Sequence, residues 1–253
     1  MLQGLQSGQC EGGQYDAILI DEAQDFAPCW VQVLKELVKP DTGSIFIADD
    51  PTQSIYRYYS WKEKGVQVAG RTRWLRIPYR NTREIYNAAF AIIQNNENIR
   101  EQLTAEGELL NPDVENPWMR SGEKPLALRI DDYSTMVQTI ADRVNGLLQE
   151  GVPPTQIAVL AARKNQIKSL RGAIMDNEVA VDTFFQFKGM EYRYVFLASV
   201  QDLFHEDDEE ATARMLRLMY MGMTRSREYL YIYYRNRLPD ALNPLHNHCD
   251  FIR

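Results

Sequence analysis

Residues 18–26 read ILIDEAQDF, an apolar run that ends abruptly in acidic and amide side chains. The first three residues are typical of a buried parallel strand, and Asp21 and Glu22 follow at its carboxyl end. Because open α/β sheets bind ligands at the carboxyl ends of their strands, this acidic pair is a candidate for holding Mg²⁺ and activating a water molecule. The alternative is a solvated turn that caps a helix.

A second strand with the same kind of ending follows. Residues 30–38 have the apolar spacing of a helix, and SIFIA at 44–48 predicts a strand that runs into DDPTQSIYRYY at 49–59. Two neighbouring parallel strands that both end in polar groups favour one shared site, in which Gln53 orients a water molecule or contacts a phosphate. The aromatic residues of this stretch either pack against the core edge or stack on unpaired bases: Tyr56, Tyr58 and Tyr59.

The rest of the chain alternates between strand and helix patterns. Strands are predicted at 74–77, 125–130, 157–162, 179–184, 194–200 and 229–234. Amphipathic helices are predicted at 81–93, 134–151, 164–175 and in a stretch that ends near 221, with Asn81 and Glu84 resembling a capping box. The polar segment 95–124 shows little periodicity and predicts a long connection. This alternation predicts an α/β fold with a mainly parallel sheet and flanking helices.

The composition is that of an ordinary soluble domain. The chain has 253 residues, 45% of them hydrophobic, and a net charge of −7. No stretch is apolar enough for a membrane helix and the amino terminus lacks the pattern of a signal peptide, so we expect a cytoplasmic protein with no membrane partner. The three cysteines are far apart in the sequence and are expected to be reduced. The net negative charge argues against a protein that coats nucleic acid non-specifically, although a local groove can be basic in an acidic protein.

Taken together, five stretches resemble ordered motifs of superfamily 1 DNA helicases of the UvrD/Rep/PcrA type. They are DEAQDF, DDPTQSIYR, LRIPYRNTREI, TFFQFKGMEYRYVFL and YMGMTRSREYLYI, and they span about residue 15 to about residue 235. The resemblance implies RecA-like domains of the P-loop NTPase fold, which bind ATP between them and move 3′ to 5′ along single-stranded DNA. Residues 1–73 would be the carboxy-terminal part of the first domain, and 74–253 a second domain without a large helical insertion.

The same resemblance implies a role for each matching residue. Asp21 would ligate Mg²⁺, Glu22 would be the base for the attacking water, and Gln53 would sense the γ-phosphate. In the second domain Tyr79 would stack on adenine and Glu191 would contact the nucleotide. Two arginines, Arg80 and Arg225, would reach the γ-phosphate. The residues expected near single-stranded DNA or a duplex junction are Tyr56, Tyr58, Thr183, Lys188 and Gly189.

Three positions depart from the family pattern. Tyr58 stands where tryptophan is common, Tyr59 where arginine is common, and Phe185 where histidine is typical. Tyr58 keeps a stacking face, whereas the other two changes replace a polar contact with an aromatic one. One DNA contact of the family is therefore in doubt.

A larger departure is the lack of a phosphate-binding loop, GxxxxGK[ST]: none of the 14 glycines is followed by lysine. We therefore expect the carboxy-terminal part of a helicase that is inactive alone and whose partner is the missing amino-terminal part. Two alternatives stay open, a motor-dead DNA-binding or regulatory module and a different phosphate-handling enzyme built on the same carboxylates. HNHC at 246–249 is interpreted as a carboxy-terminal tail rather than a metal site, and HEDDEE at 205–210 as an acidic loop.

Overall fold

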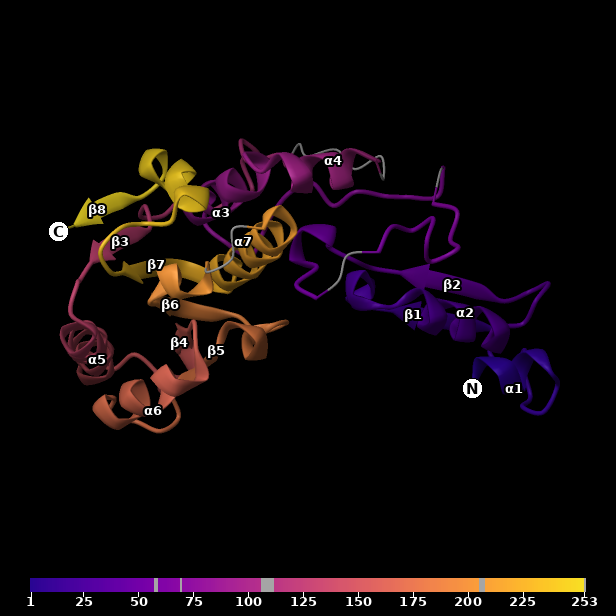
Figure 1. Ribbon diagram of the computed structural model, residues 1–253, viewed down its shortest axis with the longest axis horizontal. Coiled ribbons are helices and arrows are strands. Elements are labelled where there is room, and N and C mark those ends of the chain that lie inside the picture. The colour runs from indigo at the N-terminus through magenta and orange to yellow at the C-terminus, as the bar shows by residue number, and fades with distance from the viewer. Residues whose placement is uncertain (57–58, 69, 106–111, 205–207, 253) are drawn as a thin grey trace. The chain divides into compact units, whose positions relative to one another are not determined.

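A computed structural model describes residues 1–56, 59–68, 70–105, 112–204 and 208–252, and Figure 1 shows the ribbon. The chain divides into two compact units. Unit 1 comprises Met1–Trp74 and Gln102–Leu109, and unit 2 comprises Leu75–Glu101 and Leu110–Arg253. Each unit is described separately below.

Unit 1 is built on a two-stranded parallel sheet. Strand β1 (Ala17–Ile20) pairs with β2 (Ser44–Ile47), and helix α2 (Pro28–Leu37) connects them. A short helix, α1 (Leu2–Gln6), precedes the sheet. The small core gathers Ile20, Ala23 and Trp61, with partly buried aliphatic residues of β1, β2 and α2 around them. The strand, helix and strand expected over 18–48 are thus present.

One face of this sheet is bare. Leu19 and Phe46 lie opposite each other in the β1–β2 register, and they are 80% and 74% exposed. Parallel sheets ordinarily have both faces covered, because the crossover helices lie on them. Unit 1 therefore presents an apolar sheet face that no described part of the chain covers.

Unit 2 contains a six-stranded sheet in the order β5-β4-β6-β7-β3-β8, in which every pairing is parallel. Its strands are β3 (Leu126–Arg129), β4 (Ile157–Ala161), β5 (Ala180–Thr183), β6 (Tyr192–Ala198), β7 (Ser226–Tyr234) and β8 (Asp250–Ile252). The interior strand β4 is buried along its whole length, as expected of a strand covered on both faces. The predicted α/β class with a mainly parallel sheet is confirmed.

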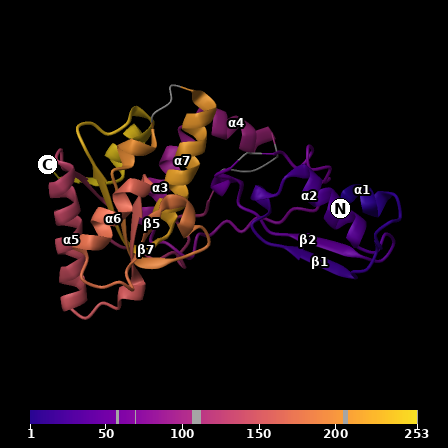
Figure 2. The same cartoon turned by 60° about the horizontal axis from the view of Figure 1, so that its bottom comes forward.

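Helices cover both faces of the unit 2 sheet, as Figure 2 shows. Helices α5 (Tyr133–Gln149) and α6 (Lys164–Ala173) lie on one face, where Met136, Ile140 and Leu170 pack into the main core. Helices α3 (Arg83–Gln94) and α7 (Glu209–Thr224) pack against each other on the other face. No helix in the described part of the chain is long and apolar enough to cross a membrane.

Several local predictions differ from the structure. Residues 74–77 form no strand, and Leu75 is fully exposed. Helix α5, predicted to begin at residue 134, begins at Tyr133 and is capped by Asp132, which accepts a hydrogen bond from Thr135 N. The segment 95–124, expected as a connection, contains helix α4 (Glu97–Ala105).

The capping box predicted at the start of α3 is also wrong. Thr82 is the N-cap residue, and the Asn81 amide is used elsewhere. Glu84 accepts hydrogen bonds from Ser121 Oγ at 2.6 Å and Gly122 N at 2.7 Å. Partial burial opposes ionisation of Glu84, but these hydrogen bonds outweigh it and lower the pKa of the carboxyl group. This glutamate therefore anchors the segment before β3 rather than the helix start.

The carboxy-terminal residues are packed rather than a loose tail. Strand β8 pairs with β3, and the ring of His246 stacks on Phe251 with centroids 4.4 Å apart. Cys249 is buried, whereas Cys10 and Cys29 are exposed, and all three are free thiols. Within the described ranges, no three His, Cys, Asp or Glu residues are grouped as metal ligands. The interpretation of 246–249 as a tail is corrected accordingly.

This packing predicts that the three thiols differ in reactivity. Burial, together with the charge of Asp250, raises the pKa of Cys249 to about 12. At pH 8 only about 10⁻⁴ of such a thiol is thiolate, the reactive form. Iodoacetamide should therefore alkylate Cys10 and Cys29 and spare Cys249 until the protein is denatured, as peptide mass spectrometry can measure. Equal labelling of all three in the folded protein would contradict the packed carboxy terminus.

Candidate functional site

The acidic pair follows β1 directly, in a distorted stretch of backbone. Asp21 is exposed, and its Oδ1 accepts a hydrogen bond from Glu22 N at 2.9 Å. Glu22 has φ 53° and ψ 39°, the left-handed region. That conformation costs a residue with a side chain about 1–2 kcal/mol and persists only where neighbouring groups enforce it. A three-residue 3-10 turn, η1 (Ala23–Asp25), follows immediately.

A chain of hydrogen bonds links Glu22 to Gln53. Gln24 Nε2 donates to Glu22 Oε2 at 2.6 Å, and Gln24 Oε1 accepts from Asp50 N at 3.1 Å. Gln53 Nε2 in turn donates to Asp50 Oδ2 at 2.6 Å. Gln24 is only 3% exposed, and each of the three hydrogen bonds is partly buried. The structure thus joins the expected base to the expected phosphate sensor through two residues that had no assigned role.

Asp21 has the properties of a magnesium ligand in a nucleotide site. Such sites commonly use one or two carboxylates, with waters and phosphate oxygens completing the octahedron. The exposed Asp21 carboxylate can supply one such oxygen while Glu22 N holds its orientation. One accessible carboxylate at a strand end therefore suits Mg²⁺ bound together with a nucleotide.

The aromatic residues after Gln53 are only partly described. Tyr56 is 58% exposed and follows the buried residues Ser54 and Ile55. Tyr58, also expected near DNA, lies outside the described residues. Tyr59 is half-buried.

Three candidate nucleotide contacts lie close together in unit 2. Arg80 Nε is 2.9 Å from Glu191 Oε1 in an ion pair whose arginine side chain is 65% exposed. Arg225 is 2% exposed; its Nε donates to Met221 O at 3.1 Å and its Nη1 to Met190 O at 3.2 Å. Met190 precedes Glu191 in sequence, so both arginines contact the same short segment.

Two further side chains fix the backbone around these arginines. Asn81 Nδ2 donates to Thr224 O at 2.9 Å and Ser226 O at 2.6 Å, the carbonyls on either side of Arg225. Arg120 Nη2 donates to Arg80 O at 2.5 Å and Arg227 O at 3.4 Å. The segment that carries Arg80 is therefore tied to the junction between α7 and β7.

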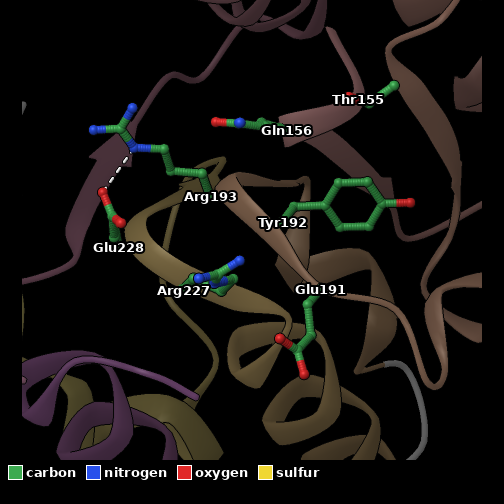
Figure 3. A pocket seen from close by; sticks show the side chains of 7 residues that line it. All are labelled: Thr155, Gln156, Glu191, Tyr192, Arg193, Arg227 and Glu228. Atoms are coloured by element: carbon green, nitrogen blue, oxygen red, sulfur yellow. Dashed lines mark hydrogen bonds and ion pairs between the residues drawn. The ribbon is translucent and has the colours of Figure 1, made fainter. Parts of the chain in front are cut away.

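Glu191 is also part of the lining of a polar pocket, which Figure 3 shows. In it Arg193 Nε donates to Glu228 Oε2 at 2.7 Å, and this bond raises the pKa of the arginine. Burial raises the pKa of Tyr192 on the opposite wall. Tyr79, expected to stack on adenine, is 61% exposed. The residues that line the pocket are Thr155, Gln156, Glu191, Tyr192, Arg193, Arg227 and Glu228.

Three of the residues expected near DNA lie at the end of β5 and in the segment between β5 and β6. Thr183 ends β5 and is buried, Lys188 is partly buried, and Gly189 has φ 78°, which glycine adopts without strain. The 3-10 turn η4 (Phe184–Phe187) between them packs closely on α7, because a Cβ at Gly222 would lie 2.6 Å from the ring of Phe184. The neighbouring Phe185 is 40% exposed.

Comparison with known proteins gives two matches in sequence, one in each half of the chain. Residues 9–64 match the family model of the UvrD/REP helicase N-terminal domain. Residues 178–233 match that of the UvrD-like helicase C-terminal domain. The resemblance to UvrD-type helicases is confirmed. No curated protein matches the chain.

Among solved structures, one similar chain is described as the C-terminal domain of a possible DNA helicase from Lactobacillus plantarum WCFS1. It is 17% identical and superimposes with a TM-score of 0.48, covering 68% of this chain and 98% of that one.

The candidate nucleotide contacts named here lie at opposite ends of the strands in the two units. In unit 1 Asp21 and Glu22 follow the carboxyl end of β1. In unit 2 Glu191 immediately precedes β6 and Arg225 immediately precedes β7, at the amino ends. The strand-end rule for α/β sheets therefore identifies the acidic pair but not the arginines, which only the motif resemblance singles out.

The linking residues were not identified from the sequence. Gln24 and Asp50 lie within quoted motifs, but their partners depend on how β1 and β2 pair. Asn81 resembled a helix cap, and Arg120 lies in a segment interpreted as a connection. No periodicity in the sequence marks any of them.

Proposed function

We propose that the chain is the carboxy-terminal portion of an ATP-dependent 3′–5′ DNA helicase or translocase of the cytoplasm, which couples ATP hydrolysis to movement on single-stranded DNA. Its support is the grouping of hydrolytic side chains within each unit. Glu22 is linked to Gln53 in unit 1, and Arg80, Glu191 and Arg225 are gathered in unit 2.

In unit 1 the proposal gives Glu22 the role of general base. Its Oε2 already accepts from Gln24 Nε2 at 2.6 Å, which fixes the orientation of the carboxylate. The other oxygen would take the proton of the attacking water. Gln53 would contact the γ-phosphate, and its hydrogen bond to Asp50 would couple that contact to Glu22. Mg²⁺ held at Asp21 would neutralise charge on the phosphate oxygens.

In unit 2 the proposal makes the two arginines stabilisers of charge on the transferred phosphoryl group. Arg80 is already exposed, and its ion pair with Glu191 is of the weak surface type that a phosphate can replace. Arg225 would have to exchange carbonyl partners for phosphate oxygens. Glu191, once released, would contact the nucleotide, and exposed Tyr79 would stack on adenine.

Contact with single-stranded DNA is proposed through aromatic and basic groups. Tyr56 and Phe185 are 58% and 40% exposed, and exposed aromatic rings can stack on bases without sequence preference. Lys188 supplies a positive charge for the phosphate backbone. Tyr58, Thr183 and Gly189 complete the proposed contact set.

The proposed partner in the same helicase is its amino-terminal part. The bare Leu19–Phe46 face is an apolar surface that further strands or helices of the first motor domain would cover. The same part would supply the phosphate-binding loop, which the present sequence does not contain.

The isolated chain is accordingly expected to show no appreciable DNA-stimulated ATP hydrolysis, because it has no loop to bind the phosphates. Phosphate release with Mg²⁺ and single-stranded DNA measures this, with the intact helicase as the positive control. Turnover comparable to that of the intact protein would contradict the proposal that the amino-terminal part supplies the phosphate-binding loop.

The same lack of a loop favours a second candidate, a motor-dead DNA-binding or regulatory module. Two observations distinguish the functions: the sequence and ATP turnover of the rest of the protein, and the affinity for single-stranded DNA with and without ATP. A helicase portion requires a GxxxxGK[ST] loop in the rest of its protein and ATP turnover there. A module binds single-stranded DNA with an affinity that ATP does not change.

A further inference from the structure

Lys64 is a buried lysine in unit 1. Only 1% of it is exposed, whereas Lys62, two residues earlier, lies at the surface. A lysine ammonium in such a place is costly unless several groups hydrogen bond to it or stabilise its charge. Its burial also separates it from the basic side chains that would face DNA phosphates.

The ammonium group of Lys64 lies against the turn that follows Glu22. Lys64 Nζ donates to Ala23 O at 3.0 Å and to Gln24 O at 3.3 Å. It also lies 4.4 Å from the ring centroid of Trp61, within the range of a cation–π contact. Hydrogen bonds from an ammonium group to carbonyls are charge-assisted and stronger than neutral ones.

The turn held in this way is also bonded to the segment after β2, because Ala23 N donates to Ala48 O at 3.1 Å. A 3-10 turn has poorer hydrogen-bond geometry than an α-helix, and here Asp25 N reaches Glu22 O at 3.3 Å. Glu22 stands directly before the turn in its left-handed conformation. Gln24, within the turn, carries the side chain that links Glu22 to Asp50. A shift of the Ala23 and Gln24 carbonyls would therefore displace both side chains.

Lys64 is itself anchored. Lys64 N donates to Ser60 O at 3.0 Å, and Gln32 Nε2 of helix α2 donates to Lys64 O at 3.0 Å. Trp61 belongs to the small core of unit 1. The ammonium therefore fixes the position of the turn relative to the core and to helix α2.

We propose that Lys64 is a positioning residue for Glu22 and Gln24, which it orients by clamping the two carbonyls of η1. Its kinetic part rests on the proposed function, because it assumes that Glu22 acts in ATP hydrolysis. Its structural part does not, because the clamp exists whether or not ATP is hydrolysed.

Hydrogen–deuterium exchange of the 253-residue chain tests the clamp without ATP. Lys64→Met keeps the apolar stem and removes the ammonium, and Lys62→Met is the matched surface control. In Lys64→Met, amide exchange in peptides covering 21–26 and 48–54 should rise about tenfold, as expected when a local opening becomes easier. Helix α2 and unit 2 should exchange as in the unaltered chain, and Lys62→Met should change none of these regions.

Kinetics of the intact helicase test the consequence. Lys64→Met should lower kcat for ATP about 100-fold, the loss that a misplacement of about 1 Å can cause, and leave KM within about twofold. Exchange at 21–26 equal to that of the unaltered chain would overturn the proposal. So would exchange raised equally throughout residues 1–74, which a lysine that only stabilises the fold would give.

The outcomes separate the two proposals. An intact protein without ATPase activity contradicts the proposed function, and the exchange measurement then still decides the clamp. An active protein in which Lys64→Met keeps its full kcat contradicts the role of Lys64 alone. If Lys64→Met does not fold, Lys64→Gln, which keeps a neutral donor, is subject to the same two criteria.

Discussion

In the intact helicase, Glu22→Gln is expected to bind Mg²⁺–ATP as the unaltered protein does and to lose turnover by about 10²- to 10⁴-fold, the contribution of a general base. The amide keeps the size of the carboxylate and still accepts a hydrogen bond from Gln24. It cannot take a proton from water. Phosphate release under steady-state conditions, together with binding of a fluorescent ATP analogue, separates loss of chemistry from loss of binding.

The matched control is Glu36→Gln, on the exposed side of helix α2. It removes the same charge from the same unit without touching the acidic turn and should leave turnover unchanged. Unaltered turnover in Glu22→Gln would remove Glu22 from the role of base. Loss of ATP binding would point instead to a structural part for its carboxylate.

Arg225→Ala should slow ATP hydrolysis by about 10³- to 10⁵-fold, the range attributed to arginines that stabilise a transferring phosphoryl group. Arg225 is buried, so its removal also takes one donor from Met190 O and one from Met221 O, which keeps its hydrogen bond from Thr224 Oγ1. A buried carbonyl that loses its partner costs about 1–3 kcal/mol of stability. Thermal unfolding measured beside the kinetics therefore distinguishes a damaged fold from a damaged site.

Arg214→Ala is the control for this arginine, because Arg214 lies exposed on the same helix, α7. Arg225→Lys adds a second test, since it keeps the charge but loses the planar fork that reaches two oxygens. We expect it to remain slow although it is more stable than Arg225→Ala. A folded Arg225→Ala protein that hydrolyses ATP within about tenfold of the unaltered rate would contradict the proposed role.

The main elements of the fold could be predicted from the sequence because periodicity reports burial directly. The uninterrupted apolar run of β4 and the helical spacing of α5 both correspond to buried faces. The failures occurred where distant contacts decide the structure. Glu84 resembled a capping residue, yet its partners are Ser121 and Gly122, 37 and 38 residues further along the chain.

In the candidate site, too, some residues could be predicted from the sequence and others could not. Asp21 and Glu22 could be singled out because acids at a strand end are unusual, and Arg80 and Arg225 because their motifs are specific. The groups that connect them could not. Gln24 meets Asp50 only after β1 and β2 pair, across 26 residues.

The Asn81 bridge has a consequence for the order of folding. Its amide joins carbonyls 143 and 145 residues away, so its loop closes only when almost the whole of unit 2 is in place. Contacts between residues so far apart in sequence form late, because the entropy of closing the loop is lost before the contact contributes any favourable free energy. A nascent chain would expose Arg80 long before Arg225 is synthesised. The two arginines therefore come together at the end of folding, and a half-synthesised protein lacks the complete pair that is proposed to bind phosphate.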